Sequence, residues 1–189
     1  MTARWVVDEV APKRDLRITW QPISLFFKNE PEPESPYYEA TWFTHRLLRV
    51  MEAARAAAGE EVVQPLYWEY GRRIHYDEDR SFDPGDALAA VGLDRDLAAA
   101  FDDERWDADI RERMDRGLAL AGDDVGTPLI GFDDEDGNRV GLFGPVITRV
   151  PPTDRSLQLW DGFVAMATVP GFWEVKRTRT ERPEFGERP

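Results

Sequence analysis

The sequence of 189 residues contains no cysteine. This excludes disulfide bonds, thiolate metal ligands and a cysteine nucleophile within these residues. Histidine is nearly as scarce, because only His45 and His75 are present and they lie 30 positions apart. Neither belongs to a metal-binding pattern such as H-E-x-x-H, so a catalytic metal is not expected.

Long apolar runs and an excess of basic charge are also missing. No segment approaches the length of a membrane span, and the N-terminus lacks the basic-then-apolar layout of a signal peptide. We therefore expect a cytoplasmic protein without a membrane partner. The net charge of −13 argues against nucleic acid as the main partner. No G-x-S-x-G elbow, P-loop or dinucleotide fingerprint supports a hydrolase, an NTPase or a Rossmann enzyme.

The composition is that of a packed globular protein, with 42% hydrophobic residues and seven tryptophans. The length suits one domain with a sizeable core, or a small domain that carries a large insertion. Residues 2–11 read as a helix that ends before Pro12. Residues 16–21 alternate apolar and polar side chains, which predicts a half-buried strand. The Pro/Glu-rich segment 29–36 is the clearest boundary in the sequence.

A block of helical patterns follows this boundary. Ser35 and Pro36 suit the start of a long helix that ends at Gly59. On this helix His45 lies between Thr44 and Arg46, and we expect it at the surface. Further helices are predicted at about 63–74, 84–91, 94–102 and 106–121. Residues 37–122 are therefore predicted to be all-helical.

Strand patterns return at 127–132 and 139–143, joined by the acidic segment 133–138. A calcium loop is not supported, because the position five residues before Gly137 is Phe132 and no glutamate closes the loop. A solvated hairpin turn is predicted instead. A last helix begins after Pro151 and Pro152. The basic run in the tail, residues 176–179, is expected to dock on the protein's own surface or to stay mobile.

Gly126, Thr127 and Pro128 stand at the entrance to the first of these strands. Proline removes a donor from a strand ladder and is tolerated mainly at strand starts, edges and bulges. The bond before proline also has an accessible cis form. Such a turn could direct backbone N–H and C=O groups outward, where they would pair with a bound thiol or peptide.

Several segments together resemble the DsbA-like branch of the thioredoxin superfamily, and in particular its mycothiol-dependent nitroreductase group, which is related to FrnE-type proteins. They occur in family order over nearly the whole chain: Arg4-Trp5, Ser24-Leu25 with Asn29-Glu30, Pro65-Leu66-Tyr67 with Gly71 and Arg73-Ile74-His75, Asp124-Val125-Gly126-Thr127-Pro128, Phe143-Gly144-Pro145-Val146, Leu159-Trp160-Asp161, and Lys176-Arg177-Thr178-Arg179-Thr180-Glu181.

The resemblance implies an α/β fold with a thioredoxin-like core formed by residues 1–36 and 123–189, split by an all-helical insertion at 37–122. Thr127 and Pro128 would be the cis-proline pair that faces the active-site thiol in this family.

Asn29, Tyr37 and His75 match positions that line the family's active-site cleft. Each also has a structural interpretation. Asn29 fits an ordinary turn residue, Tyr37 fits a buried aromatic with its hydroxyl at the surface, and His75 fits a favourable partner of a helix dipole.

The chain departs from the family at the first helix, where members carry a Cys-Pro-Trp-type motif. Met1 falls just after the position of that motif, so the leading strand, the turn and the cysteine are missing. One hypothesis is that the chain starts at an internal methionine, with about 20–25 further residues upstream, which is the length of a strand and a turn. The rival hypothesis is a natural cysteine-free relative.

The resemblance implies a thiol-dependent oxidoreductase, with a mycothiol-like thiol as co-substrate and no tightly bound cofactor. Its substrate would be an electron-poor nitro compound or a disulfide, held by Asn29, Tyr37, His75, Gly126, Thr127 and Pro128. The given chain has no catalytic residue of its own and should be inactive.

Two alternatives stay open. A non-catalytic thioredoxin-fold protein would bind a small thiol or a protein partner. The kappa-type glutathione transferase branch uses a serine at the first helix, but residues 1–10 contain none.

Overall fold

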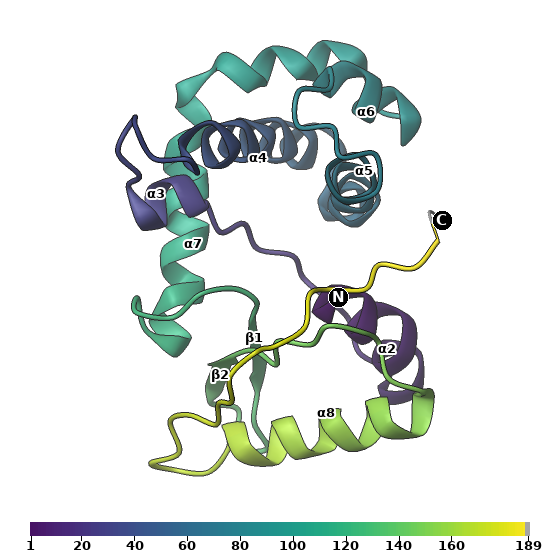
Figure 1. Ribbon diagram of the computed structural model, residues 1–189, viewed down its shortest axis with the longest axis vertical. Coiled ribbons are helices and arrows are strands. Elements are labelled where there is room, and N and C mark those ends of the chain that lie inside the picture. Colours follow the sequence, from purple (N-terminus) through teal and green to yellow (C-terminus); the bar gives the residue numbers. More distant parts are fainter. Residues whose placement is uncertain (188–189) are drawn as a thin grey trace. The chain divides into compact units, whose positions relative to one another are not determined.

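The computed structural model describes residues 1–187, which form two compact units (Figure 1). The sheet unit comprises Met1–Ile18 and Arg116–Gly186, and the helical unit comprises Thr19–Asp115. Each has its own hydrophobic cluster. The chain passes from one unit to the other between Ile18 and Thr19 and again between Asp115 and Arg116. The predicted insertion has different bounds, from residue 37 to residue 122. The thioredoxin-like core stays a prediction.

The sheet unit begins with a helical stretch made of α1 (Thr2–Arg4), the π-helix η1 (Trp5–Val10) and α2 (Ala11–Arg14). The predicted end before Pro12 is wrong, because the helix continues to Arg14 and stops at Asp15, whose φ is +51°. Proline lacks the N–H that an interior helix position normally donates. The helix accommodates it just after a π-turn, in which the N–H of Ala11 bonds to the C=O of Val6.

The predicted hairpin is confirmed. Strands β1 (Leu129–Asp133) and β2 (Arg139–Phe143) pair antiparallel, with Gly131 opposite Gly141. The acidic connection forms a turn in which the Asp134 carboxylate accepts backbone N–H bonds from Asp136 (3.0 Å) and Asn138 (2.7 Å). These hydrogen bonds with Asn138 and Asp136 lower the pKa of Asp134. The carboxylate therefore stabilises the turn itself.

Helix α8 (Thr153–Ala167) supplies the other half of the sheet unit's core. Trp5 is fully buried, and its ring centroid lies 6.0 Å from that of Trp160. The indole N–H of Trp5 also donates to the C=O of Ser156 over 3.3 Å. The rings of Phe132, in the hairpin, and Phe163, in α8, also pack together, with their centroids 6.2 Å apart. The core thus joins the N-terminal helix, the hairpin and α8.

The predicted strand at residues 16–21 is wrong, since this segment is extended but has no strand partner among residues 1–187. Its alternating apolar residues pack in different places. Leu16 contacts the core of the sheet unit, whereas Trp20 contacts that of the helical unit. The C=O of Trp20 accepts a bond from Arg55 (3.1 Å). The alternation therefore reflects a connection between two cores rather than one face of a sheet.

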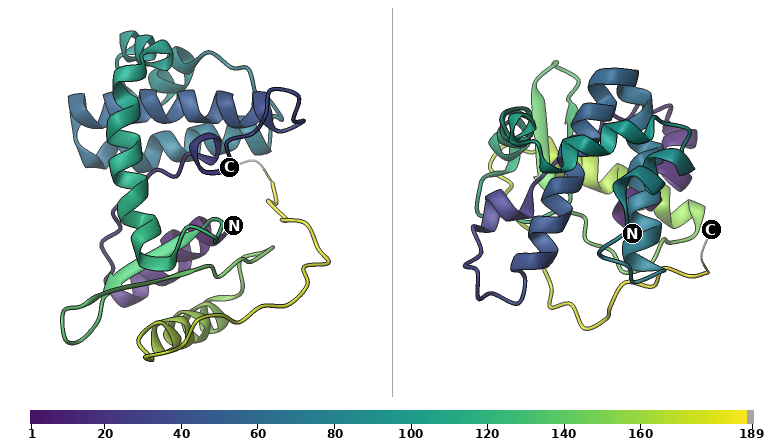
Figure 2. Two further views of the ribbon diagram at one scale, coloured as in Figure 1. Left: turned by 90° about the vertical axis from the view of Figure 1, so that its left-hand side faces the viewer. Right: turned by 90° about the horizontal axis from the view of Figure 1, so that it is seen from above.

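The helical unit confirms the predicted block of helices. Figure 2 shows α4 and α5 running side by side. The short α3 was not predicted. The elements of this unit are α3 (Leu25–Asn29), α4 (Tyr38–Ala58), η2 (Glu60–Val62), α5 (Val63–His75), α6 (Pro84–Ala90), the 3-10 helices η3 (Arg95–Asp102) and η4 (Glu104–Trp106), and the start of α7 (Asp107–Ala121).

The core of the helical unit follows the helical period of α4. Leu47, Val50 and Ala54 recur at intervals of three and four residues and are almost fully buried. They form one cluster with Leu66 of α5 and Leu88 of α6. Gly59, with a φ of +95°, ends α4 as predicted, because glycine adopts this conformation without strain.

The tail of the sheet unit is partly docked on that unit. The N–H of Glu184 bonds to the C=O of Thr148 (2.7 Å), and Arg149 pairs with Glu181 (2.5 Å). The basic run 176–179 itself is exposed. Among residues 1–187, no helix is both long enough and apolar enough to cross a bilayer.

Candidate functional site

The predicted binding residues of the sheet unit lie in the loop just before β1. The Thr127–Pro128 peptide bond is cis, as is Gly144–Pro145. Gly126 and Thr127 are exposed, and the C=O of Pro128 accepts a bond from the N–H of Gly144 (2.8 Å). The backbone N–H and C=O of Thr127 make no hydrogen bond with any residue in 1–187. These two groups can therefore pair with an extended ligand.

Asn29, Tyr37 and His75 all belong to the helical unit, and each lies at the end of a helix. Asn29 is the last residue of α3, Tyr37 immediately precedes α4, and His75 is the last residue of α5. All three are exposed, Tyr37 to 70%. The interpretation of Tyr37 as a buried aromatic is therefore wrong. The side chains are accessible to a ligand.

The expectation that His45 lies at the surface is wrong, because only 1% of this residue is exposed. Its ring packs against Phe27, with centroids 4.2 Å apart, and stacks on Trp42 at 5.4 Å. Its Nδ1 lies 3.0 Å from the hydroxyl of Ser24, and its Nε2 lies 3.2 Å from Asp107. His45 is thus the polar centre of an otherwise aromatic environment.

The surroundings favour the neutral form of His45. Burial lowers its pKa, the cations Arg49 and Arg111 act in the same direction, and the attraction of Asp107 only partly opposes them. The hydroxyl of Ser24 already accepts the N–H of Phe27 over 3.1 Å. Its proton can be donated to Nδ1, in which case the imidazole proton is on Nε2, 3.2 Å from Asp107.

Asp107 is itself held in place by Arg49. The guanidinium donates from two nitrogens to the two carboxylate oxygens, at 2.6 and 2.7 Å, and the Arg49 side chain is almost fully buried. This bidentate geometry is among the stronger ion-pair arrangements in proteins. It joins the first turn of α7 to the middle of α4.

Ser24, His45 and Asp107 form a chain of the residue types found in hydrolytic enzymes, but a nucleophilic role is not supported. Ser24 is 1% exposed, and its hydroxyl caps α3. A nucleophile must meet its substrate, so this chain of contacts instead anchors α3, the helix that carries Asn29. The sequence held one signal for this role, since Trp42, His45 and Arg49 share one face of α4.

A second buried charge cluster centres on Glu52, which is 3% exposed. Its carboxylate lies 3.0 Å from Arg113 and 3.5 Å from Arg55. Burial raises the pKa of Glu52, although both arginines oppose this effect. The cluster connects α4 with α7 inside the helical unit, which is a structural role.

Comparison with known proteins gives matches that extend over nearly the whole chain. The family model described as "Rv2466c-like: Mycothiol-dependent nitroreductase Rv2466c" matches residues 1–177. The chain belongs to this family. It is also similar to the uncharacterized protein Rv2286c of Mycobacterium tuberculosis (strain ATCC 25618 / H37Rv). The two sequences are 27% identical over 183 residues, which cover 95% of this chain and 76% of that protein.

Membership of the Rv2466c-like family confirms the predicted resemblance to mycothiol-dependent nitroreductases. The family's name makes mycothiol the thiol co-substrate and a nitro compound the substrate class. This agrees with thiol-dependent reduction, the predicted type of reaction. The placement within the DsbA-like branch stays a prediction. Within residues 1–187, no group of three or more His, Asp or Glu side chains is arranged to hold a metal ion.

Proposed function

We propose that this protein acts in mycothiol-dependent reduction of nitro-type or disulfide substrates, on a DsbA-like thioredoxin core in the cytoplasm. The match to the Rv2466c-like family over residues 1–177 carries this proposal. The exposed loop before β1, with its unpaired Thr127 backbone groups, supports it.

In the proposed site, mycothiol or its mixed disulfide lies along the loop at Thr127 and pairs with its backbone N–H and C=O. Gly126 is exposed beside this segment, and the C=O of Pro128 ties the loop to the N–H of Gly144. Within the helical unit, Asn29, Tyr37 and His75 offer polar groups that can bind a thiol or polarise a substrate. Each can do so because its side chain is exposed at a helix end.

The reduction balances with two thiols for each two-electron step. A nitro group gains two electrons and two protons, loses one oxygen as water and becomes a nitroso group. Two thiols lose the same electrons and protons and form one disulfide. Where the first thiol belongs to the enzyme, a mixed disulfide with mycothiol precedes release. The 189 residues contain no cysteine and supply no such thiol.

We therefore expect these 189 residues alone to bind mycothiol without turning it over. Titration calorimetry with reduced mycothiol measures the binding, and loss of nitro absorbance together with formation of mycothiol disulfide measures turnover. Saturable binding without turnover agrees with the proposal. Absence of binding would contradict the proposed function, and turnover would contradict the expected inactivity.

Exposed site residues allow a sharper test, because their substitution should leave the fold intact. We expect Asn29→Ala and His75→Gln each to weaken mycothiol binding about fivefold, the equivalent of one hydrogen bond. Thr127→Ala keeps both backbone groups and should bind as the unchanged protein does. Equal affinities for all four proteins would count against the assigned residues.

The absence of cysteine favours one second candidate, a non-catalytic thioredoxin-fold protein that binds a small thiol or a protein partner. Isolation of the protein from its own cells distinguishes the two. Mycothiol-dependent nitro reduction by that material favours the enzyme. Mycothiol binding with no turnover there favours the binding protein.

A further inference from the structure

The segment of residues 173–180, in the tail of the sheet unit, belongs to no helix or strand and makes no hydrogen bond or ion pair with any residue in 1–187. The chain is held on both sides of this segment. The N–H of Phe172 bonds to the C=O of Val169 (3.1 Å), and Glu181 pairs with Arg149 (2.5 Å). The segment itself is therefore available to another molecule.

The side chains of the 173–180 segment divide into an apolar end and a basic end. Trp173 is 86% exposed and Val175 is 75% exposed, and large apolar side chains left in water favour association. Lys176, Arg177 and Arg179 follow, and they stand out in a chain with a net charge of −13. In an extended chain the four steps from Trp173 to Arg177 span about 13 Å. A fitting partner offers apolar and acidic groups at this separation.

The β1–β2 hairpin of a second copy of this chain offers both kinds of group. At its turn Glu135 and Asp136 are exposed and take part in no ion pair with residues 1–187. At its open end Phe143 is 41% exposed and Val146 is 44% exposed. The four steps of β2 from Arg139 to Phe143 again span about 13 Å. The spacing of acidic and apolar groups on the hairpin therefore matches the spacing of basic and apolar groups on the segment.

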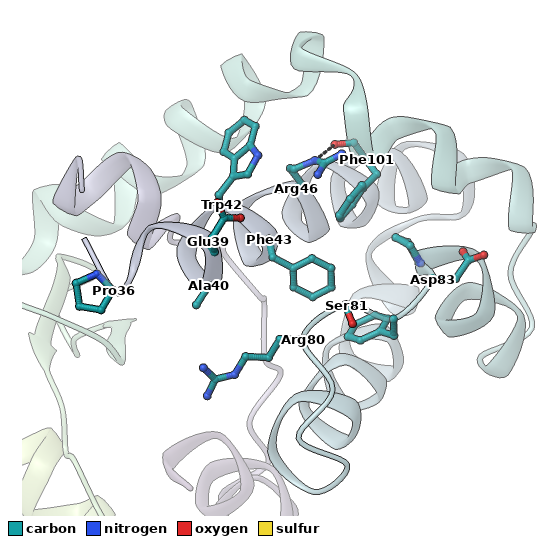
Figure 3. A pocket seen from close by; sticks show the side chains of 12 residues that line it. Pro36, Glu39, Ala40, Trp42, Phe43, Arg46, Arg80, Ser81, Asp83 and Phe101 are labelled. Carbon is teal, nitrogen blue, oxygen red and sulfur yellow. Dashed lines mark hydrogen bonds between the residues drawn. The ribbon is translucent and has the colours of Figure 1, made fainter. Parts of the chain in front are cut away.

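The cleft of about 640 Å³ in the helical unit is a poorer partner for this segment (Figure 3). In Figure 3 Arg46 and Arg80 lie on opposite sides of the Phe43 ring. Glu39 and Asp83 also line the cleft, so its two acids and two arginines leave no net charge that attracts a basic segment. The hairpin turn, in contrast, contains four acids in succession.

We propose that two copies of this chain form a two-fold dimer, in which the 173–180 segment of each copy lies along the hairpin of the other. Arg177 and Arg179 pair with the acids of the turn, and Trp173 packs against Phe143 at the open end. The ion pairs select the partner, and the covered tryptophan supplies most of the affinity. The two-fold axis makes both contacts at once and closes the assembly. This dimer goes beyond the proposed function and does not depend on thiol chemistry.

Sedimentation velocity of the full chain over a range of protein concentrations tests for the dimer. We expect the share of dimer to rise with protein concentration. At a fixed protein concentration it should fall when salt is added, because salt screens exposed ion pairs. A monomer at every concentration, or a dimer that is indifferent to salt, would overturn the proposal.

Substitution of the exposed tryptophan tests the apolar contact. Trp173→Ser should raise the dissociation constant of the dimer at least about tenfold, as for the loss of an aromatic anchor. Val169→Ser, at another exposed apolar side chain of the same tail, is the matched control and should leave the dissociation constant unchanged. Equal dissociation constants for the two variants would contradict the proposed contact.

Exchange of charge identifies the acidic partner. Arg177→Glu with Arg179→Glu should abolish the dimer, and so should Glu135→Arg with Asp136→Arg. All four side chains are exposed, so the fold should be retained. The four changes together restore opposite charges and should restore the dimer. Arg17→Glu, at an exposed arginine outside the segment, is the control and should dimerise as the unchanged chain does. Failure of the fourfold variant to dimerise, or loss of the dimer in Arg17→Glu, would overturn the pairing of segment and turn.

Discussion

At the scale of single residues, the interior of the helical unit is organised by polar side chains as much as by apolar ones. Ser24, His45, Arg49, Glu52 and Glu69 are all less than 5% exposed. Burial of such groups costs free energy unless each finds a partner. The contacts of His45 with Ser24 and Asp107 place a polar group beside each of its ring nitrogens.

The first prediction concerns His45. His45→Asn should lower the free energy of unfolding at pH 8 by about 1–3 kcal/mol, because it leaves buried partners unsatisfied. The folded pKa of His45 lies below the unfolded value, so the unfolded state binds the extra proton as pH falls below about 6.5. The stability due to neutral His45 is therefore lost on acidification, and the difference between the two proteins should narrow at pH 5.5.

Urea unfolding at both pH values measures this difference. His75→Asn is the comparison variant at the other histidine, whose pKa is also lowered by burial; because this residue is exposed, its effect on stability should be smaller than that of His45→Asn at both pH values. The prediction fails if the difference in free energy of unfolding between His45→Asn and the unchanged protein is the same at pH 8 and pH 5.5. His45 would then have the same pKa in the folded and unfolded states.

The second prediction concerns Glu52. Its replacement by alanine removes the carboxylate shared by Arg55, which is 8% exposed, and Arg113; Arg55 then keeps only its pair with Glu60 (3.1 Å). We expect a loss of about 3–5 kcal/mol in denaturant unfolding, as for other broken buried pairs. Asp102→Ala breaks the pair with Arg46 at a side chain that is 77% exposed, and should cost less than about 1 kcal/mol. Similar losses in both variants would argue against a buried charge cluster.

At the scale of elements, regular periodicity predicted the long helices and the hairpin. The i, i+3, i+4 spacing of Leu47, Val50 and Ala54 and the stop at Gly59 define α4 within two residues. Helix α3 was missed because five residues are too few to show a period, and its signal is only the Ser24 cap. The false strand at 16–21 arose because alternation reports contact with apolar surroundings, not the presence of a partner strand.

Local sequence patterns do not report contacts between distant segments, and this also limited the prediction of the candidate site. The family resemblance pointed to Asn29, Tyr37 and His75, whereas local pattern gave each a structural interpretation; all three are exposed at helix ends. The burial of His45 could not be read from its neighbours Thr44 and Arg46. It depends on Ser24 and Asp107, which are far away in sequence and meet it only after the chain folds.

The third prediction compares two glycines. A Cβ on Gly141 would lie 3.1 Å from the C=O oxygen of Ile130 and 3.1 Å from Leu120, so Gly141→Ala should destabilise the hairpin by about 1–3 kcal/mol. A Cβ on Gly162, inside α8, would meet nothing within 4 Å. Gly162→Ala should therefore stabilise by about 0.5–1 kcal/mol. Thermal unfolding measures whether each variant is more or less stable than the unchanged protein. A change in the same direction for both variants would contradict this interpretation of the packing.

At the scale of the whole molecule, the chain holds two cores of different origin. The core of the sheet unit is assembled from both ends of the chain, since Trp5 packs with Trp160. The core of the helical unit is made within one continuous segment, as are its buried ion contacts. A continuous segment with its own core can fold alone, whereas a core assembled from distant segments needs the entire chain.

The fourth prediction is therefore that residues 19–122 fold as a separate helical protein. This fragment keeps α7 intact to its end at Gly122, whose φ is +93° and whose N–H bonds to the C=O of Leu118. Circular dichroism should show a helical spectrum and one cooperative thermal transition. Glu52→Ala in the fragment should lower its midpoint, because the broken cluster lies inside it. A fragment with a random-coil spectrum, or one whose melting is indifferent to Glu52, would show that the helical core requires the rest of the chain.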